Sequence, residues 1–455
     1  MRNDASDAGG SLPRVLIVAE NASEAFGGEA ALPLRYFRLL RDFGIPVSLL
    51  THVRVRGELE SIFPNEMNQI YFVEETRWHR LFWRIGTHLE PRLRHLTTAF
   101  VLRALTQLAQ RRTARRLIQQ IGINVVHQPT PVSPREPSFI YDLGVPVIIG
   151  PMNGNMSYPP AFRHEEPAIT RIALMVGRAS TRLLNAFFPG KKRASMLLVA
   201  NERTRKALGS LAGRQIRYLP ENAVDTEVWR WRRIRSDTSA NCRFVFVGRL
   251  IPSKGVDLWL RALERVTQGG MAQTATIIGD GPERHALQEQ ARAQGMLATE
   301  LGQVGKIWFA GRRTQSEIAD LLAAHDCLVL PTLIESGGAV LLEGMAMGLP
   351  VISTDWGGPA DYVDDSCGIL VPLDSREQLV ASLASAMERL ATDPELRERM
   401  GAAGRLKVER HYTWKGKIAQ VIEFYREAIA GQLAHERSDE DGHNRRLTPS
   451  PLRPH

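Results

Sequence analysis

The feature that most constrains the fold of this 455-residue chain is a regular alternation of short apolar runs with longer segments of helical period. In the first half, the runs that predict strands are residues 14–20, 46–52, 69–73, 124–128, 146–150 and 196–201. In the second half they are residues 243–248, 274–279, 307–311, 327–332, 351–354 and 368–371. Strands that alternate with helices in this way predict parallel sheets in doubly wound α/β domains.

The length and the two sets of strands predict two domains, because one hydrophobic core does not usually serve a chain of this size. The break is expected near residues 220–225, where a strand-like segment ends. The predicted parts are a flexible N-terminus at 1–13, a first Rossmann-like domain at 14–222, a second at 223–414, a final helix at 415–433 and a disordered tail at 434–455. The tail is charged and has almost no apolar residues.

Positive charge is concentrated in the first half of the chain. Residues 1–225 hold 30 lysines and arginines against 19 aspartates and glutamates, whereas residues 226–455 hold 28 against 30. This asymmetry favours an anionic partner for the first half, such as a phospholipid surface, a phosphorylated acceptor or nucleic acid. The start of the chain lacks the pattern of a signal peptide, and no apolar run is long enough to span a membrane, so we expect a cytoplasmic protein.

The most informative segment, residues 331–350, combines a strand end, a Gly-rich turn and a short helix. Gly337 and Gly338 allow backbone N–H groups to approach a ligand closely, and the helix N-terminus behind them favours a phosphate. Glu335 lies in the turn, and Glu343 follows eight positions later on the helix. A carboxylate at that position suits vicinal hydroxyls, such as those of a ribose, although a capping glutamate and a partly buried helix glutamate would give the same pattern.

A second segment, residues 244–255, places two cations after a predicted strand. The strand delivers Arg249 and Lys254 to the carboxyl edge of the sheet, where doubly wound folds bind ligands. Two such cations can neutralise a diphosphate and stabilise the charge that develops on it as it leaves. A third segment, residues 277–284, forms a tight turn at the same edge and by itself indicates no more than an ordinary turn.

Three segments of the first half also follow predicted strands. Gly27 and Gly28 open a predicted helix at 30–43, a phosphate-cradling arrangement that lacks the full Gly-x-Gly-x-x-Gly spacing. His127 ends a strand, and we expect its side chain to face a cleft between the domains, although a lone histidine is more often structural. Asn153 follows the next strand and is a candidate contact to an acceptor.

Taken together, these segments resemble the retaining GT-B glycosyltransferases of family four, the glycosyl transferases group 1. The resemblance covers most of residues 14–433 and is firmer in the second half. It implies the GT-B fold, in which two facing Rossmann-like domains enclose an interdomain cleft, the first binding the acceptor and the second the nucleotide-sugar donor, with a final helix that crosses back to the first. The motifs that carry it, in the order of the family, are Gly248-Arg249-Leu250, Lys254-Gly255, Gly279-Asp280-Gly281-Pro282 and Glu335-x7-Glu343.

The resemblance also assigns roles to individual residues. Arg249 and Lys254 would hold the donor diphosphate, Glu335 would contact the transferred sugar, and Glu343 would contact the ribose. His127 would lie beside the transferred sugar, and with Arg249, Lys254 and Glu335 it completes the predicted catalytic set. The other predicted donor contacts are Gly27, Gly28, Ser336, Gly337, Gly338, Ala339, Val340 and, at the nucleotide base, Arg312.

No metal site or cofactor is predicted. The three cysteines have no metal-ligand spacing, and the single Asp-x-Asp triplet, Asp439-Glu440-Asp441, falls in the predicted tail. The co-substrate would be a UDP- or GDP-linked sugar, transferred on the front face with retention, and Arg249, Lys254 and the helix dipole would replace the metal of GT-A enzymes. One departure from the family pattern, Gly337 where an aromatic residue is common, leaves more room around the sugar.

An arginine-rich stretch in the first half indicates the kind of surface and acceptor that the protein contacts. Residues 75–120 hold ten arginines against Glu75 and Glu90, interleaved with aromatic and aliphatic residues such as Trp78 and Trp83. A basic amphipathic stretch of this kind suits an anionic membrane surface, and a second basic run follows at 163–214. We therefore predict peripheral contact with the inner leaflet and a lipid-linked or saccharide acceptor of cell-envelope or exopolysaccharide biosynthesis, although solvated arginine faces of ordinary helices give the same pattern.

Three other functions are weighed against this one. A GT-B nucleotide-sugar epimerase would share the architecture but would turn over its donor without an acceptor. A nucleic-acid-binding protein would use the basic first half, but no recognised module is present and the Glu335-x7-Glu343 helix would be idle. A nicotinamide dehydrogenase would require the Gly-x-Gly-x-x-Gly spacing that Gly27 and Gly28 do not supply.

Overall fold

The computed structural model describes residues 12–88, 97–165, 187–209, 215–232, 242–271 and 273–447, with the backbone alone for 435–447. These residues divide into two compact units. The first contains the described residues of 1–154, 176–219 and 418–455, and the second contains those of 155–175 and 220–417. The chain therefore passes from the first unit to the second between Leu219 and Pro220, three residues before the predicted boundary.

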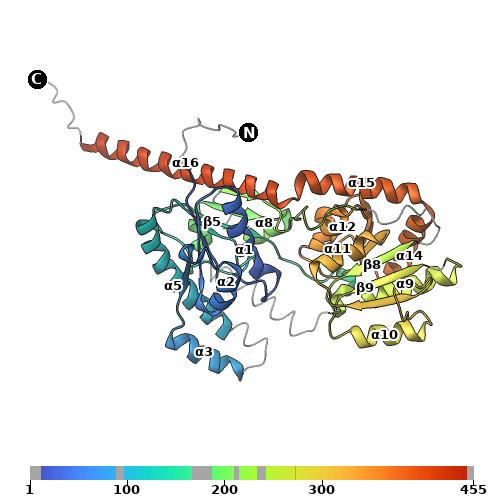
Figure 1. Ribbon diagram of the computed structural model, residues 1–455. Helices are drawn as coiled ribbons and strands as arrows, with labels where there is room; N and C mark the ends of the chain where they lie inside the picture. The colour runs from blue at the N-terminus through green and yellow to red at the C-terminus, as the bar shows by residue number, and fades with distance from the viewer. Residues whose placement is uncertain are drawn as a thin grey trace, which may run out of the picture. The chain divides into compact units, whose positions relative to one another are not determined.

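The first unit, which carries the labels α1, α5 and β5 in Figure 1, is built on a seven-stranded parallel sheet with the order β3-β2-β1-β4-β5-β6-β7. The central strand β1 pairs with β2 on one side and β4 on the other, so Val15 lies opposite both Val47 and Val125. Its four residues are fully buried, which explains an uninterrupted apolar sequence where a half-exposed strand would alternate. The strands are β1 (Val15–Val18), β2 (Val47–His52), β3 (Ile70–Val73), β4 (Val125–Gln128), β5 (Val147–Met152), β6 (Met196–Val199) and β7 (Gln215–Tyr218).

The helices of the first unit connect these strands. They are α1 (Gly28–Asp42), α2 (Arg56–Ile62), α3 (Arg77–Thr87), α5 (Thr98–Ile121), α7 (Gly190–Arg193) and α8 (Glu202–Leu208), with short 3-10 turns η1 (Val53–Val55) and η2 (Met67–Gln69). The helix predicted at 30–43 corresponds to α1, which begins two residues earlier because Gly27 serves as its N-cap.

The second unit is built on a six-stranded parallel sheet with the order β10-β9-β8-β11-β12-β13. Its strands are β8 (Arg243–Val247), β9 (Thr274–Ile278), β10 (Ile307–Gly311), β11 (Cys327–Leu330), β12 (Val351–Thr354) and β13 (Gly368–Val371). Its helices are α9 (Val256–Gln268), α10 (Arg284–Ala293), α11 (Gln315–Ala323), α12 (Ala339–Ala346), α13 (Gly358–Tyr362), α14 (Arg376–Thr392) and α15 (Pro394–His411), with the 3-10 turns η3 (Pro160–Glu165) and η5 (Pro252–Lys254).

Each of the twelve strand ranges predicted from the apolar runs overlaps a strand of the structure. In both sheets the order of strands reverses beside the first strand of the unit, next to β1 in one and next to β8 in the other. The predicted α/β class with two doubly wound parallel sheets is therefore confirmed. Among the described residues, no helix combines the length and the apolar character that crossing a bilayer requires.

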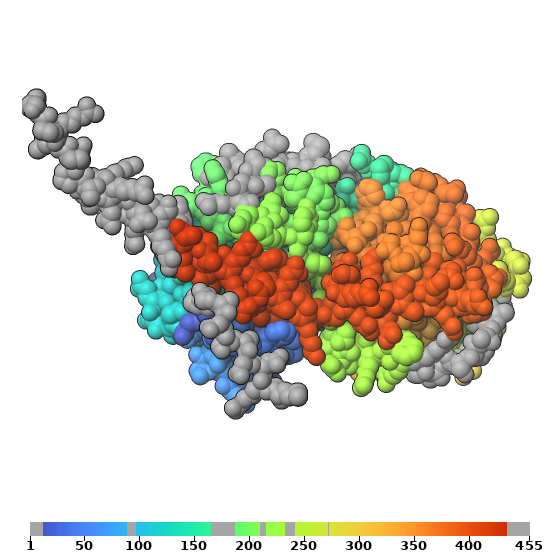
Figure 2. Space-filling view, turned by 90° about the horizontal axis from the view of Figure 1, so that it is seen from above, coloured from blue at the N-terminus to red at the C-terminus, as the bar shows by residue number. Residues whose placement is uncertain are grey.

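The last helix, α16 (Trp414–Leu447), is longer than predicted, because the segment expected to be a disordered tail continues it to Leu447. A charged sequence lacks apolar residues for packing, but extending an existing helix needs no new nucleus, and the first proline after the helix is Pro449. From Ile418 onward α16 belongs to the first unit, where Arg217 forms an ion pair with Glu427 and Gln432 donates to the carbonyl of Gly144. Figure 2 shows its red residues lying against the green segment that contains β7.

Residues 155–165 are a second difference, because the prediction assigned them to the first domain and the structure groups them with the second unit. The indole N–H of Trp356 donates to the carbonyl of Ser157 at 3.0 Å, and Phe162 is buried in the core of the second unit. Because of these contacts the segment packs with the second unit, although it lies in the first half of the sequence. The predicted flexible N-terminus lies outside the described residues, apart from Leu12 and Pro13.

Candidate functional site

The loops that follow β8, β9, β10 and β11 gather at the carboxyl edge of the second sheet, because all its strands are parallel. The order of strands reverses between β8 and β11, and ligands of doubly wound folds bind at such a reversal. Arg249 follows β8, and Lys254 ends the short turn η5. Glu335 comes after β11, in the loop before α12. The structure therefore brings the predicted donor-binding segments of the second half to one edge of one sheet, whereas Gly27 and Gly28 lie in the first unit.

Two glycines allow these loops to pack against one another. Gly255 has a φ of +61°, and a Cβ atom there would lie 2.2 Å from the carbonyl oxygen of Pro331. Gly279 has a φ of +143°, and its Cβ atom would lie 1.8 Å from the carbonyl oxygen of Gly248. Any side chain at either position would force the loops apart, so the spacing of glycines in the sequence reflects backbone contact.

The backbone contact holds Lys254 beside Glu335. The carbonyl of Ser253 accepts hydrogen bonds from the Leu333 amide at 2.8 Å and from the Thr332 hydroxyl at 3.1 Å, which ties η5 to the loop after β11. On this support the ammonium group of Lys254 forms an ion pair with the carboxylate of Glu335. Both side chains are mostly buried, at 15% and 18% exposed, so their charges interact more strongly than a pair in open solvent.

The Gly-rich turn leads from this ion pair into α12. Gly338 is the N-cap of α12 with a φ of +84°, and it leaves the first amides of the helix directed outward from its N-terminus. Behind the turn, the Gly358 amide donates to the carbonyl of Glu335 at 2.7 Å. Ser336, Ala339, Val340 and Glu343 are partly exposed. The arrangement presents a cation, a carboxylate and a helix N-terminus together, which is the chemistry that a phosphate and a hydroxyl-bearing group need.

Sequence reasoning missed one group that borders the turn. A Cβ atom at Gly337 would lie 2.3 Å from the side-chain nitrogen of Asn222, and that nitrogen donates to the hydroxyl of Tyr362 at 3.3 Å. Burial raises the pKa of Tyr362 well above its usual value, so the hydroxyl stays protonated. The only sequence signal for Asn222 was its place in the predicted break between domains, which says nothing of a contact more than a hundred residues away.

Arg249 and Arg312 are exposed where β8 and β10 end. Their position at the carboxyl edge agrees with the predicted location. Their roles toward a diphosphate and a base stay predictions.

In the first unit, Gly27 and Gly28 lie on an exposed loop that leads into α1. The carboxylate of Glu58 shapes this loop, accepting from the Ser23 hydroxyl at 2.5 Å and from the Glu24 amide at 2.7 Å. Gly27 has a φ of +103°, and nothing lies within 4 Å of a Cβ atom built on either glycine. The loop is therefore exposed, and its contact with a donor stays a prediction. Glu58 was not identified from the sequence.

The prediction that His127 faces a ligand is wrong. Its side chain is fully buried within the first unit. Nε2 lies 2.7 Å from the carbonyl oxygen of Gly150, which can only accept, so Nε2 carries the proton and Nδ1 accepts from the hydroxyl of Tyr425 at 2.7 Å. The end of β4 is thus covered by α16, and His127 anchors that helix.

Asn153 is also corrected. It follows β5 as predicted, but it is 4% exposed. Its side-chain oxygen accepts from Asn201 at 3.1 Å, and its backbone amide donates to the carbonyl of Val132 at 2.8 Å. Because Asn201 also caps α8, the pair fixes the loops after β5 and β6 to each other and does not present Asn153 to an acceptor.

The triplet Asp439-Glu440-Asp441 lies within α16 and not in a disordered tail. Its side chains belong to the part of α16 that is described by backbone alone.

Comparison with known proteins agrees with this geometry. Residues 241–393 match the family model described as Glycosyl transferases group 1. The alpha-D-kanosaminyltransferase of Streptomyces kanamyceticus is 30% identical over 184 residues, which are 40% of this chain and 45% of that protein. The D-inositol 3-phosphate glycosyltransferase of Saccharomonospora viridis is 33% identical over 189 residues, 41% of this chain and 42% of that protein. The chain spans about half the length of the curated relatives it matches.

Solved structures show the same fold over nearly the whole chain. Sucrose-phosphate synthase from Thermosynechococcus elongatus matches with a TM-score of 0.60 and 18% identity, covering 92% of this chain and all of that one. A glycosyltransferase from Rickettsia africae matches with a TM-score of 0.59 and 13% identity, covering 92% and 99%. Anabaena HepE in complex with UDP matches with a TM-score of 0.55 and 16% identity, covering 90% and 99%.

These likenesses confirm the predicted GT-B fold class. They also confirm the predicted resemblance, since the family model matches residues that include Lys254 and Glu335, and curated relatives are named as glycosyltransferases. The chain is therefore similar to the group 1 glycosyltransferases, and the family match lies in its residues 241–393.

Proposed function

We propose that this protein is a retaining glycosyltransferase that moves a sugar from a UDP- or GDP-linked donor to a hydroxyl group of a lipid-linked or polysaccharide acceptor. The pathway would be cell-envelope or exopolysaccharide biosynthesis. The observation that carries the proposal is the ion pair of Lys254 and Glu335 at the carboxyl edge of the second sheet, beside the N-terminus of α12 and within the residues that match the group 1 family model. Relatives of this chain are named as glycosyltransferases, and HepE, which matches its fold, has been crystallised with UDP and with UDP-glucose.

In the proposed reaction the bond between the sugar's anomeric carbon and the diphosphate oxygen breaks, and a bond from that carbon to the acceptor oxygen forms on the same face. The acceptor's proton passes to the departing diphosphate, so no protein carboxylate acts as nucleophile. Lys254, Arg249 and the N-terminus of α12 would stabilise the negative charge that grows on the leaving group. Glu335 would hold the hydroxyls of the transferred sugar and Glu343 those of the ribose.

We further propose that the reaction needs no metal, because two cationic side chains and a helix N-terminus would supply the charge on the diphosphate. The test is a panel of UDP-, GDP- and ADP-sugars, each with EDTA or with Mg²⁺, in which thermal protection and slow release of nucleotide are measured. We expect one donor class to protect the protein and to be hydrolysed equally in both buffers. Loss of hydrolysis in EDTA would refute metal independence. If none of the donors protected the protein against thermal unfolding, the proposed glycosyltransferase activity would be refuted.

The same panel separates the main alternative. An epimerase would convert the sugar of its donor without releasing nucleotide, and this would appear as a new nucleotide sugar in the acceptor-free reaction. A nucleic-acid-binding protein would respond to none of the donors.

We also propose that the first unit contacts the inner face of an anionic membrane through α3. One face of α3, with His79 and Gly86, is buried. Since residues three and seven positions apart share a helix face, two more stripes remain toward solvent. The apolar stripe is Trp78, Leu81 and Ile85, with Trp78 60% exposed, and the basic stripe beside it is Arg77, Arg80 and Arg84.

An exposed apolar stripe next to a basic one suits a helix that lies in a lipid interface. Residues 89–96 of the predicted stretch, and half of the second basic run, lie outside the described residues. Flotation with phosphatidylglycerol vesicles tests the proposal, with phosphatidylcholine vesicles for comparison. We expect flotation only with the anionic lipid and its loss in Trp78→Glu, whereas Trp231→Glu, on the second unit, should float like the original protein. Equal behaviour of the two variants would contradict a membrane role for α3.

A further inference from the structure

A pocket of about 380 Å³ with several charged side chains in its lining lies entirely within the first unit. It is lined by residues from the loops that follow β1, β2 and β4, including Glu20, Arg54 and Thr130. β1 and β4 are neighbours at the point where the order of the sheet reverses. This is the position at which doubly wound sheets bind ligands.

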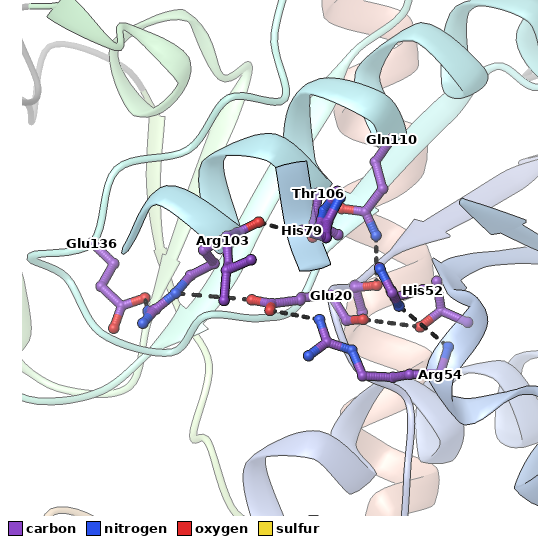
Figure 3. A network of polar contacts seen from close by, with 11 residues as sticks. Glu20, His52, Arg54, His79, Arg103, Thr106, Gln110 and Glu136 are labelled. Atoms are coloured by element: carbon purple, nitrogen blue, oxygen red, sulfur yellow. Dashed lines mark hydrogen bonds and ion pairs between the residues drawn. The ribbon is translucent and has the colours of Figure 1, made fainter. Parts of the chain in front are cut away.

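Charged side chains from four different segments meet in this pocket, as Figure 3 shows. The guanidinium of Arg54 lies 2.9 Å from one carboxylate oxygen of Glu20, and that of Arg103 lies 3.8 Å from the other. Arg103 also forms an ion pair with Glu136. A third carboxylate, that of Glu29, lines the same pocket and accepts from the Val132 amide at 3.0 Å.

The surrounding structure holds this network in place. The Arg54 amide donates to Nδ1 of His52 at 3.2 Å, and Gln110 donates to the carbonyl of Ala19 at 2.7 Å, directly before Glu20. His79 of α3 contacts the Thr106 hydroxyl of α5 at 3.1 Å, which fixes α3 to the helix that carries Arg103. The polar groups are therefore preorganised and need little reordering when a ligand arrives.

Two aromatic rings border the polar groups. Trp83 of α3 and Phe26 of the loop before α1 both line the pocket, yet they are 61% and 58% exposed. Exposed apolar surface that is rimmed by polar groups is a feature of ligand-binding grooves. The flat face of such a ring suits the C–H face of a sugar, while the carboxylate and guanidinium groups bind pairs of hydroxyls.

The balance of charge limits which ligand fits. Three carboxylates, those of Glu20, Glu29 and Glu136, face two guanidinium groups, and each guanidinium already has a carboxylate partner. An anionic ligand would meet the excess negative charge, whereas a neutral or cationic ligand would not. The pocket therefore disfavours a phosphate or a uronic acid, in contrast to the positive charge of the first half as a whole.

We propose that this pocket binds the acceptor through a neutral or amino-bearing saccharide ring that stacks on Trp83 and receives hydrogen bonds from Arg54 and Arg103 while donating to Glu20 and Glu136. The inference rests on the proposed glycosyltransferase function and narrows its acceptor class. Any phosphate or lipid part of the acceptor then lies outside this pocket.

The experiment measures binding to the full-length protein by saturation-transfer NMR and tryptophan fluorescence. The probes are methyl α-D-glucopyranoside, N-acetylglucosamine and glucosamine, against glucose 6-phosphate and glucuronic acid. We expect at least one neutral or amino sugar to bind about tenfold or more tightly than either anionic sugar. Trp83→Ala should weaken that binding about tenfold, the loss expected for one substantial contact, whereas Trp78→Ala, an exposed tryptophan on the same helix outside the pocket, should not.

A charge variant tests the selectivity separately. Glu136→Gln removes one negative charge, so it should reduce the ratio of the affinity for the neutral or amino sugar to the affinity for glucose 6-phosphate. Binding of none of the sugars, tighter binding of the anionic ones, or equal effects of the two tryptophan variants would overturn the inference. Calorimetry with UDP on the same proteins separates this result from the proposed function. UDP binding without sugar binding would refute only the proposed role of the pocket. Sugar binding without UDP binding would refute the proposed glycosyltransferase function.

Discussion

Replacing Lys254 by methionine should weaken the binding of UDP without unfolding the protein. Lys254 and Glu335 are 15% and 18% exposed, a degree of burial for which an effective dielectric constant of about 20 is appropriate. Two unit charges ~4 Å apart then interact by about 4 kcal/mol, part of which is offset by desolvation. We expect a loss of about 2–4 kcal/mol in UDP binding, which is roughly 30- to 1,000-fold in Kd.

Removing the partner should have the opposite effect on nucleotide affinity. Glu335 is an anion next to the proposed diphosphate site, so Glu335→Gln frees the ammonium of Lys254 for the phosphate. UDP should bind this variant as well as, or up to about tenfold tighter than, the original protein. Transfer of sugar should still fall, because the carboxylate that would hold the sugar hydroxyls is lost.

Isothermal titration of UDP at constant ionic strength measures both changes. Arg292→Met is a matched control, because it breaks the exposed ion pair with Glu289 on α10 and should alter UDP binding by less than about 0.5 kcal/mol. The reasoning is refuted if Lys254→Met binds UDP as tightly as the control does, or if Glu335→Gln weakens the binding of UDP as much as Lys254→Met does.

Three further predictions follow from the packing. Burial lowers the pKa of His325 to about 4, so the unfolded state takes up a proton before the folded state does as the pH falls below 6.5. The free energy of unfolding, measured with urea, should therefore drop on the order of 2–3 kcal/mol between pH 7 and pH 4.5. The drop should be smaller in His325→Gln. Gly255→Ala should lower the free energy of unfolding by more than about 3 kcal/mol, because the added Cβ would meet the Pro331 carbonyl. Gly44 has a φ of +72° and open space around it, so Gly44→Ala should lower the free energy of unfolding by only about 1 kcal/mol. Equal melting temperatures of the two variants would contradict this. Tyr425→Phe should lower stability by about 1–3 kcal/mol and leave kcat unchanged, since the hydroxyl bonds buried His127; a fall in kcat at unchanged stability would restore a catalytic role for that histidine.

The strands and the donor segments were predictable because their signals are local. A strand buried on both faces, such as β1, must be apolar throughout, and loops in close backbone contact require glycine at positions such as Gly255 and Gly279. The first constraint acts on consecutive residues. The second joins residues that are distant in the sequence, such as Gly255 and Pro331, but it leaves a visible mark as a glycine at or soon after a predicted strand end.

The environment of His127 was not predictable in the same way. Its partner Tyr425 is 298 positions away, on a helix whose path no local pattern reveals. The pocket of the first unit has the same character, because Glu20, Arg54, Arg103 and Glu136 come from four segments and only the sheet order brings them together. The extent of α16 was misjudged for a different reason: low hydrophobicity removes packing partners but does not by itself end a helix.

The central claim, that a nucleotide diphosphate binds at the carboxyl edge of the second sheet, is tested most directly by the double variant Arg249→Ala/Lys254→Ala. Calorimetry with UDP and GDP, alongside circular dichroism to verify folding, gives the answer. We predict an intact fold and no measurable binding of either nucleotide, where the original protein binds at least one. A folded double variant with the nucleotide affinity of the original protein would contradict the account.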